Sequence, residues 1–168
     1  MVFKKEVLDA INRQINKELY SAYLYLSMSA FIEIKSFHGM AHWLKEQSKE
    51  EVKHAMRLYK HIIDREGNVE LYQIAEPPKS WKSHIDVFEK AYEHEVEITL
   101  SIHKLVEIAE MHKDRAAYAM LQWFVNEQIE EEASTKKIAD QLKMIGQNCG
   151  SILHYDKSLG KREEDKSE

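Results

Sequence analysis

Hydrophobic residues recur at intervals of three and four along four long segments of the chain. This period places them on one face of an α-helix. The predicted helices span residues 3–33, 37–66, 83–111 and 114–145, and a short fifth helix is expected at 151–160. In the first of them, the apolar face is expected to carry Val7, Ile11, Ile15, Ala22, Leu26 and Ser29. Only five glycines and two prolines interrupt the chain, which favours long helices over a many-stranded sheet.

The connections between these segments differ greatly in length. "KSFHG" joins the first two segments and "HKD" joins the third and fourth, so each pair is expected to form an antiparallel hairpin. The connection at 67–82 can stretch to roughly 50 Å, which matches the length of about 45 Å of a 30-residue helix. The sequence therefore predicts an all-α fold, an antiparallel four-helix bundle with one long crossover and a short C-terminal fifth helix. Two hairpin domains joined by a linker are the alternative, although a lone hairpin buries little core.

Local signals mark some boundaries of these elements. Ser83, three residues before Asp86, predicts a capping box at the start of the third helix, and Gly146 is placed to end the fourth. Residues 1–160 are expected to form one domain. The segment 161–168, "KREEDKSE", is expected to be a polar, solvated C-terminal tail.

Polar residues interrupt the apolar face of every long segment near its middle. They lie three or four residues from the neighbouring hydrophobic positions, so they share the face that points to the core. The interrupting residues are Glu18, Glu51, His54, Glu95, Gln128 and Glu131. Both hairpins repeat one spacing, in which a carboxylate is followed 33 residues later by two polar residues three positions apart.

This spacing predicts that the six polar groups meet. Residues equally far from the turn of a hairpin lie at the same height, and the midpoint of each set falls in its short connection. Four carboxylates and one imidazole should then lie in the centre of the bundle, where no lysine or arginine shares these faces. Buried carboxylates without a counter-charge are costly, so one or two bound cations are predicted, with iron, manganese or zinc suited to these ligands. The alternative is that the helices are rotated and the carboxylates are solvated.

Composition and charge exclude several other classes of protein. The net charge of −5 carries no basic surface for nucleic acid, and no apolar run approaches the roughly 20 residues of a membrane span. The N-terminus lacks the apolar segment of a signal peptide. A single cysteine, Cys149, excludes an intrachain disulfide and a cysteine-rich metal site. These features are typical of a cytoplasmic protein.

Four stretches carry a family resemblance: "NKELYSAYLYLSMSA", "KEEVKHAM", "YEHEVEIT" and "LQWFVNEQIEEE". Over residues 1–160 the chain resembles the ferritin-like di-iron superfamily and, within it, the non-haem ferritins of bacteria and archaea. The resemblance implies an iron storage protein with ferroxidase activity. Such a protein binds Fe(II) as a pair, oxidises it with dioxygen or hydrogen peroxide, and stores a ferric mineral in a homo-oligomeric shell of 24 subunits.

The resemblance also implies roles for the central residues. Glu18, Glu51 and His54 would bind the first iron of each chain. Glu51 would bridge to a second iron that is held by Glu95 and Glu131. The shell's contacts around its fourfold axes would involve the short fifth helix.

Further residues match peripheral positions of the same family. Gln128 would lie beside the second iron, and Tyr25 matches a tyrosine that can supply an electron, although core packing alone would also explain it. A third iron site is implied at Glu50, Glu127 and Glu130, for which ordinary solvated helix carboxylates are the alternative interpretation.

Departures from the family pattern indicate which kind of ferritin-like protein the sequence fits. The second hairpin has Gln-x-x-Glu where the first has Glu-x-x-His, so the second iron should be held more weakly and pass through. The haem-binding methionine of bacterioferritins would fall at Val52, so no haem is expected. A di-iron or di-manganese carboxylate oxidase or peroxidase without mineral storage is the main alternative. A rubrerythrin would need more cysteines, a DNA-protecting miniferritin would place its site between subunits, and a helical interaction module would bind no metal.

Overall fold

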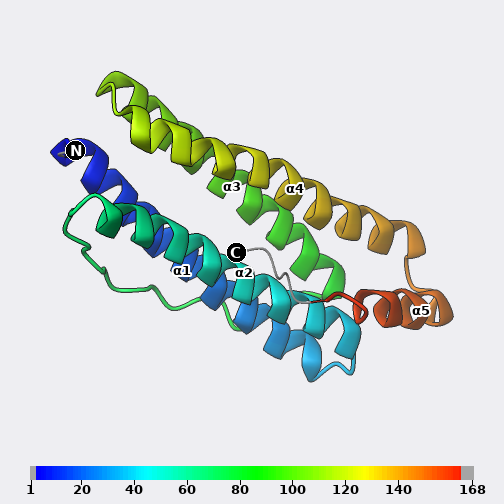
Figure 1. The fold of residues 1–168 in the computed structure, drawn as a ribbon. Coiled ribbons are helices and arrows are strands. Elements are labelled where there is room, and N and C mark those ends of the chain that lie inside the picture. Colours follow the sequence, from blue (N-terminus) through cyan, green and yellow to red (C-terminus); the bar gives the residue numbers. More distant parts are fainter. Residues whose placement is uncertain (1–2, 164–168) are drawn as a thin grey trace.

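Four long helices lie side by side as a bundle, and a short fifth helix lies at one end (Figure 1). The computed structural model describes residues 3–163, within which the chain forms these five helices and no strand. The helices are α1 (Lys5–Glu33), α2 (His38–Asp64), α3 (His84–Met111), α4 (Arg115–Ile145) and α5 (Cys149–Leu159). The predicted all-α fold is confirmed. No helix in the described part combines the length and apolar character needed to cross a membrane.

The segment between α2 and α3 crosses the full height of the bundle alongside α1. Asn12 Nδ2 donates to the carbonyl of Asn68 at 3.1 Å, and Ser27 Oγ donates to the carbonyl of Pro78 at 2.7 Å. The crossover thus follows α1 from residue 12 to residue 27, in the same direction. As a result α1 and α4 run one way and α2 and α3 the other, which brings the middles of all four helices to one height.

The helix ends have identifiable causes. Ser83 Oγ accepts from the backbone N–H of Asp86 at 3.2 Å at the start of α3, as the sequence predicted. Gly146 ends α4 with φ of 60°, also as predicted. Lys113, between α3 and α4, takes the left-handed conformation with φ of 53° although it is not a glycine.

The buried apolar residues form two clusters separated by polar side chains. One cluster lies toward the α1–α2 turn and includes Met28, Leu44 and Phe88. The other lies toward the opposite end and includes Ile15 and Leu58. Between them the centre of the bundle is occupied by buried carboxylates, amides and an imidazole.

Leu26 does not belong to the core, contrary to the sequence prediction. Its side chain is 47% exposed, whereas Tyr25 and Met28 are buried. A step of four residues from Ala22 turns about 40° beyond a full helical turn, which carries Leu26 off the narrow face that packs at this height. Leu26 therefore belongs to the outer surface of α1.

The chain after α4 folds back onto α2. The buried Asp156 carboxylate accepts the backbone N–H groups of Gly39 at 3.2 Å and Met40 at 2.8 Å. The tail expected to be solvated begins differently, because Arg162 donates to the carbonyl of Trp43 at 3.2 Å on α2. Residues 164–168 of the predicted tail lie outside the described residues.

Candidate metal centre

The first group of potential metal ligands joins α1 to α2. One ligand atom each from Glu18, Glu51 and His54 lie within 4.8 Å of one another, and all three side chains are buried. The two helices are antiparallel and meet at this height, while Glu51 and His54 share a face because they are three residues apart. His54 Nδ1 lies 3.4 Å from a Glu51 oxygen.

The second group joins α2 to the other hairpin and shares a member with the first. Oxygens of Glu51, Glu95 and Glu131 also lie within 4.8 Å of one another, and all three residues are buried. Glu51 is thus a member of both groups. Two cations bound here would share the Glu51 carboxylate as a bridge.

A third group includes one of the residues expected at a peripheral site. His54, Glu127 and Glu131 can each offer an atom within 4.8 Å of the others, with Glu127 partly buried. Glu50 instead forms an ion pair with Arg162, and Glu130 is exposed. A joint third site of Glu50, Glu127 and Glu130 therefore stays a prediction.

Two buried glutamines donate hydrogen bonds to the central carboxylates. Each glutamine lies one helical turn before a central glutamate of its own helix. Gln14 Nε2 donates to Glu18 at 2.8 Å. Gln47 Nε2 donates to Glu51 at 3.2 Å and to Glu131 at 2.5 Å. Neither glutamine was expected here from the sequence, yet each stands four residues before a central glutamate, the spacing that puts two side chains on one helix face.

Glu95 accepts hydrogen bonds from two neutral residues, Tyr25 and Gln128. The Tyr25 hydroxyl donates to Glu95 Oε1. Gln128 Nε2 lies 3.2 Å from Glu95 Oε2 and 3.2 Å from the hydroxyl of Thr99. Tyr25 is therefore both packed in the core and bonded to a candidate ligand.

Burial and mutual repulsion shift the acid–base behaviour of this centre. Burial and then the charge of Glu51 raise the pKa of Glu18 to about 8. Burial, followed by the neighbouring carboxylate of Glu95, raises the pKa of Glu51 and of Glu131 well above the usual value. Glu18 Oε2 is buried with no hydrogen-bond partner in the described structure. Burial and repulsion thus disfavour the charged forms of these carboxylates in the metal-free protein, and the Glu18 oxygen without a partner fits a cation ligand.

Aromatic and polar residues line the border of the centre. His54 packs edge-on against Trp123 and Phe124, with ring centroids 5.5 and 6.1 Å away. His94 is partly buried, and its Nε2 lies 2.7 Å from Ser21 Oγ. Burial lowers the pKa of His94 to about 4, so it is neutral at neutral pH.

Comparison with known proteins identifies the family. A model of the ferritin-like domain matches residues 8–145, which contain nearly all of both hairpins and all the potential ligands described above. The chain belongs to the ferritin family. It is 44% identical over 158 residues to the bacterial non-heme ferritin of Campylobacter jejuni, covering 94% of this chain and 95% of that protein. The bacterial non-heme ferritin of Bacteroides fragilis is 40% identical over 161 residues, covering 96% and 100%.

Solved ferritin structures share the whole fold. An engineered closed form of the Archaeoglobus fulgidus ferritin superposes with a TM-score of 0.96 at 44% identity, covering 98% of this chain and 100% of that one. The open-pore ferritin of the same archaeon gives a TM-score of 0.95 at 45% identity, covering 96% and 98%. The ferritin family membership therefore rests on the complete bundle.

Proposed function

We propose that this ferritin stores iron and acts as a ferroxidase at the centre of each bundle. The observation that carries the proposal is the pair of overlapping ligand groups that share Glu51. Such an arrangement holds two cations a few ångströms apart, as a two-electron oxidation of paired Fe(II) requires. The ferritin names of its relatives support the same function.

The proposed reaction follows from the ligands that this chain presents. Two Fe(II) ions, the substrate, would bind between Glu18, Glu51 and His54 and between Glu51, Glu95 and Glu131. Each ion gives up one electron; the two electrons and two protons reduce dioxygen to hydrogen peroxide, or hydrogen peroxide to two waters. Anionic oxygen ligands favour the more highly charged Fe(III), so the carboxylates promote this oxidation. The protons that the free carboxylates hold leave when Fe(II) binds.

Tyr25 and Gln128 would assist without supplying a strong ligand. We assign Tyr25 as a residue able to provide one electron, with Glu95 Oε1 placed to receive its proton. Gln128 is a neutral amide at the position where the first hairpin has a carboxylate. Glu51 is then the one carboxylate shared by both positions. The second iron would be held less tightly than in a centre with two shared carboxylates, and it would leave more readily than a permanent di-iron cofactor would.

The two overlapping ligand groups support a stoichiometry of two central irons per chain. We propose two irons per chain at the shared centre and a third, weaker position that involves Glu127 with Glu50 and Glu130. No haem is expected. The alternative is a di-iron or di-manganese oxidase or peroxidase that turns over without storing mineral.

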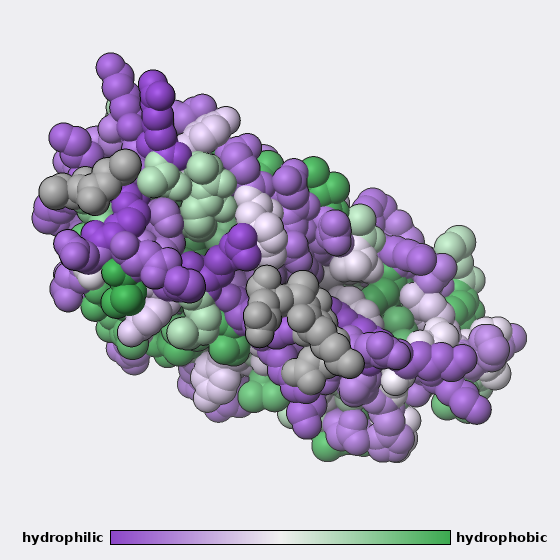
Figure 2. All heavy atoms as spheres, in the orientation of Figure 1, coloured by the Kyte–Doolittle hydropathy of each residue, from purple (hydrophilic) through white to green (hydrophobic). Residues whose placement is uncertain are grey.

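Storage requires an enclosed space that one bundle does not provide. We propose a homo-oligomeric shell of 24 chains, with the cytoplasm as its compartment. Figure 2 shows a largely hydrophilic face with apolar residues among the polar ones. On α1, α2 and the crossover, large apolar side chains stay exposed in the single chain and would be covered by neighbours. They include Tyr23, Leu26, Val52, Met56 and Leu71.

Replacing the shared carboxylate tests the proposed ferroxidase centre. Glu51→Ala removes a ligand from both cation positions, so the initial rate of Fe(II) oxidation should fall by a factor of about 100 or more. The rate is measured by stopped-flow absorbance after mixing with Fe(II) in air. Glu97→Ala, which removes an exposed carboxylate from α3, serves as the control and should retain the rate. Full activity in a correctly folded and assembled Glu51→Ala protein would show that oxidation takes place elsewhere.

A further inference from the structure

Arg162 lies far along the chain from the candidate metal centre and yet reaches its border. The Asp156 carboxylate holds α5 on the first turn of α2 through the backbone N–H groups of Gly39 and Met40. The residues after α5 then pass along α2, where His42 Nε2 donates to the carbonyl of Arg162 at 2.8 Å. The fold therefore positions this arginine through its backbone as well as its side chain.

The guanidinium of Arg162 makes several directed contacts on α2. Its Nη2 pairs with the carboxylate of Glu50, and its Nη1 donates to Gln47 Oε1 at 2.9 Å and to the carbonyl of Trp43 at 3.2 Å. The group also stacks on the Trp43 ring, 4.4 Å from the centroid. The Arg162 and Glu50 side chains are only 19% and 17% exposed. This ion pair is thus partly shielded from water, which strengthens it relative to a surface pair.

The same contacts extend into the centre through one amide. Gln47 accepts from Arg162 with its oxygen, which leaves its NH₂ group to donate to Glu51 and Glu131. Glu50 in turn is close enough for its charge to contribute to the raised pKa of Glu51 and of Glu131. Arg162 therefore sits where a positive charge acts on the edge of the cation site.

We propose that Arg162 is a displaceable counter-charge for Glu50, which it holds in the metal-free protein and releases when a cation binds Glu50 at the peripheral third position. This inference rests on the proposed function, because it concerns that third position. The ligand of that position is a divalent cation such as Fe(II), and the pairing of Arg162 with Glu50 weakens the binding of the cation there.

The physical basis is competition for one carboxylate. The Arg162 guanidinium stays charged, so loss of its proton does not release Glu50, and a second cation must compete with it for the carboxylate. A site whose binding-competent form is partly occupied by an internal partner binds with an apparent affinity reduced by that occupancy. Arg162 would thus keep the third position empty at low Fe(II) and let it fill only after the central pair.

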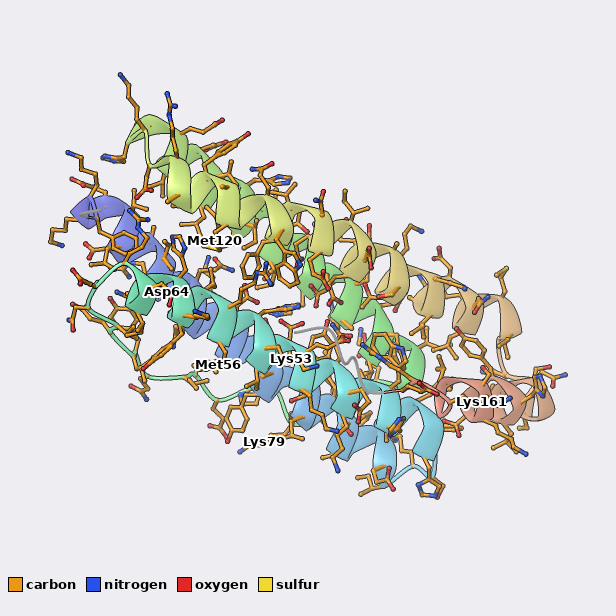
Figure 3. The ribbon with its side chains drawn as sticks, viewed as in Figure 1. Lys53, Met56, Asp64, Lys79, Met120 and Lys161 are labelled. Carbon is orange, nitrogen blue, oxygen red and sulfur yellow. The ribbon has the colours of Figure 1, made fainter. Side chains whose placement is uncertain are left out.

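Zinc titration of the assembled protein tests this competition without oxidation. Zn²⁺ accepts carboxylate and imidazole ligands and has no redox chemistry, so calorimetry reports binding alone. Arg162→Gln should tighten the third Zn²⁺ per chain by about three- to tenfold, and the gain should shrink at high salt. Lys161→Gln is the matched control, because Lys161 is an exposed neighbour whose loss changes the net charge equally (Figure 3). It should leave all three affinities unchanged.

A double variant distinguishes the Arg162–Glu50 ion pair from a general effect of net charge. In Glu50→Gln the carboxylate that Arg162 holds is gone, so adding Arg162→Gln should not tighten the third Zn²⁺. Equal effects of Arg162→Gln and Lys161→Gln would overturn the proposal, as would a loss of thermal stability in Arg162→Gln with unchanged zinc binding. Two tightly bound Zn²⁺ per chain with no third in any variant would overturn it while leaving the proposed ferroxidase centre intact. No buried zinc binding at all would contradict both.

Discussion

Buried carboxylates determine the energetics of the metal-free centre at the scale of single residues. Glu18, Glu51, Glu95 and Glu131 are all buried, and burial raises the pKa of each. Neutral donors, rather than lysines or arginines, provide the hydrogen bonds described for them. The site is therefore built to exchange protons for cations, which links its metal affinity to pH.

The stability of the metal-free protein should fall as pH rises from 6.5 to 8.5. Glu18 has a pKa of about 8 when folded, against an ordinary value of 4.5. The folded state binds more protons in this interval, so the contribution of Glu18 is fully present below the unfolded pKa and is lost as pH passes the folded pKa. The lowered pKa of His94 has the opposite effect, but only below its ordinary value of 6.5.

Thermal unfolding at a fixed scan rate measures this dependence in the presence of a chelator. Glu18→Gln keeps the shape of the side chain and removes its titration, so its melting temperature should vary less across the same interval. A native protein whose melting temperature is as flat as that of the variant would contradict the assigned pKa. Added Zn²⁺ should stabilise the native protein most at the upper end of the range.

Some residues of the centre could be predicted from the sequence, and others could not. Glu51 and His54 stand out because strongly polar side chains on a core face interrupt the apolar pattern. Gln47 leaves a weaker signal, since a neutral amide on a helix is common and only its position one turn before Glu51 distinguishes it. Arg162 gave no signal, because 112 residues separate it from Glu50 and only the docking of α5 brings them together.

At the scale of elements, periodicity predicts the long helices closely because each must bury one continuous face. The predicted segment 114–145 differs by one residue at its start from α4, which spans Arg115–Ile145. The fifth helix begins at Cys149, two residues earlier than predicted, because the Asn148 side chain caps its first turn. The docking of that helix on α2 could not be read from the sequence, since it depends on the absence of a side chain at Gly39.

Gly39→Ala should detach α5 from the bundle. A Cβ atom at this position would lie 1.7 Å from the backbone oxygen of Asp156, which no side-chain rotation relieves. Amide hydrogen exchange in α5 should accelerate at least about tenfold while the middle of each long helix stays protected. Gly150→Ala is the control, because the nearest atom to its added Cβ is 3.6 Å away. Unchanged protection of α5 in Gly39→Ala would show that this close contact does not hold the helix.

The whole molecule places its reactive groups between two apolar clusters. These clusters lie at the two ends of the bundle and provide the buried apolar area that stabilises it without the central residues. The polar residues of the centre are therefore not needed to stabilise the bundle and can act as cation ligands. Large apolar side chains stay exposed on the outer faces of a single bundle. Their exposure supports the proposed shell, in which neighbouring chains would cover them.

Iron loading tests the central claim most directly. Fe(II) is added in air far beyond two per chain, and the iron that elutes with the protein from a sizing column is counted. Many irons per chain are expected in an assembly of about 475 kDa, the mass of 24 chains of 19.8 kDa. Iron that stops near two per chain would contradict storage and indicate an oxidase, and the absence of retained iron would contradict the metal centre itself.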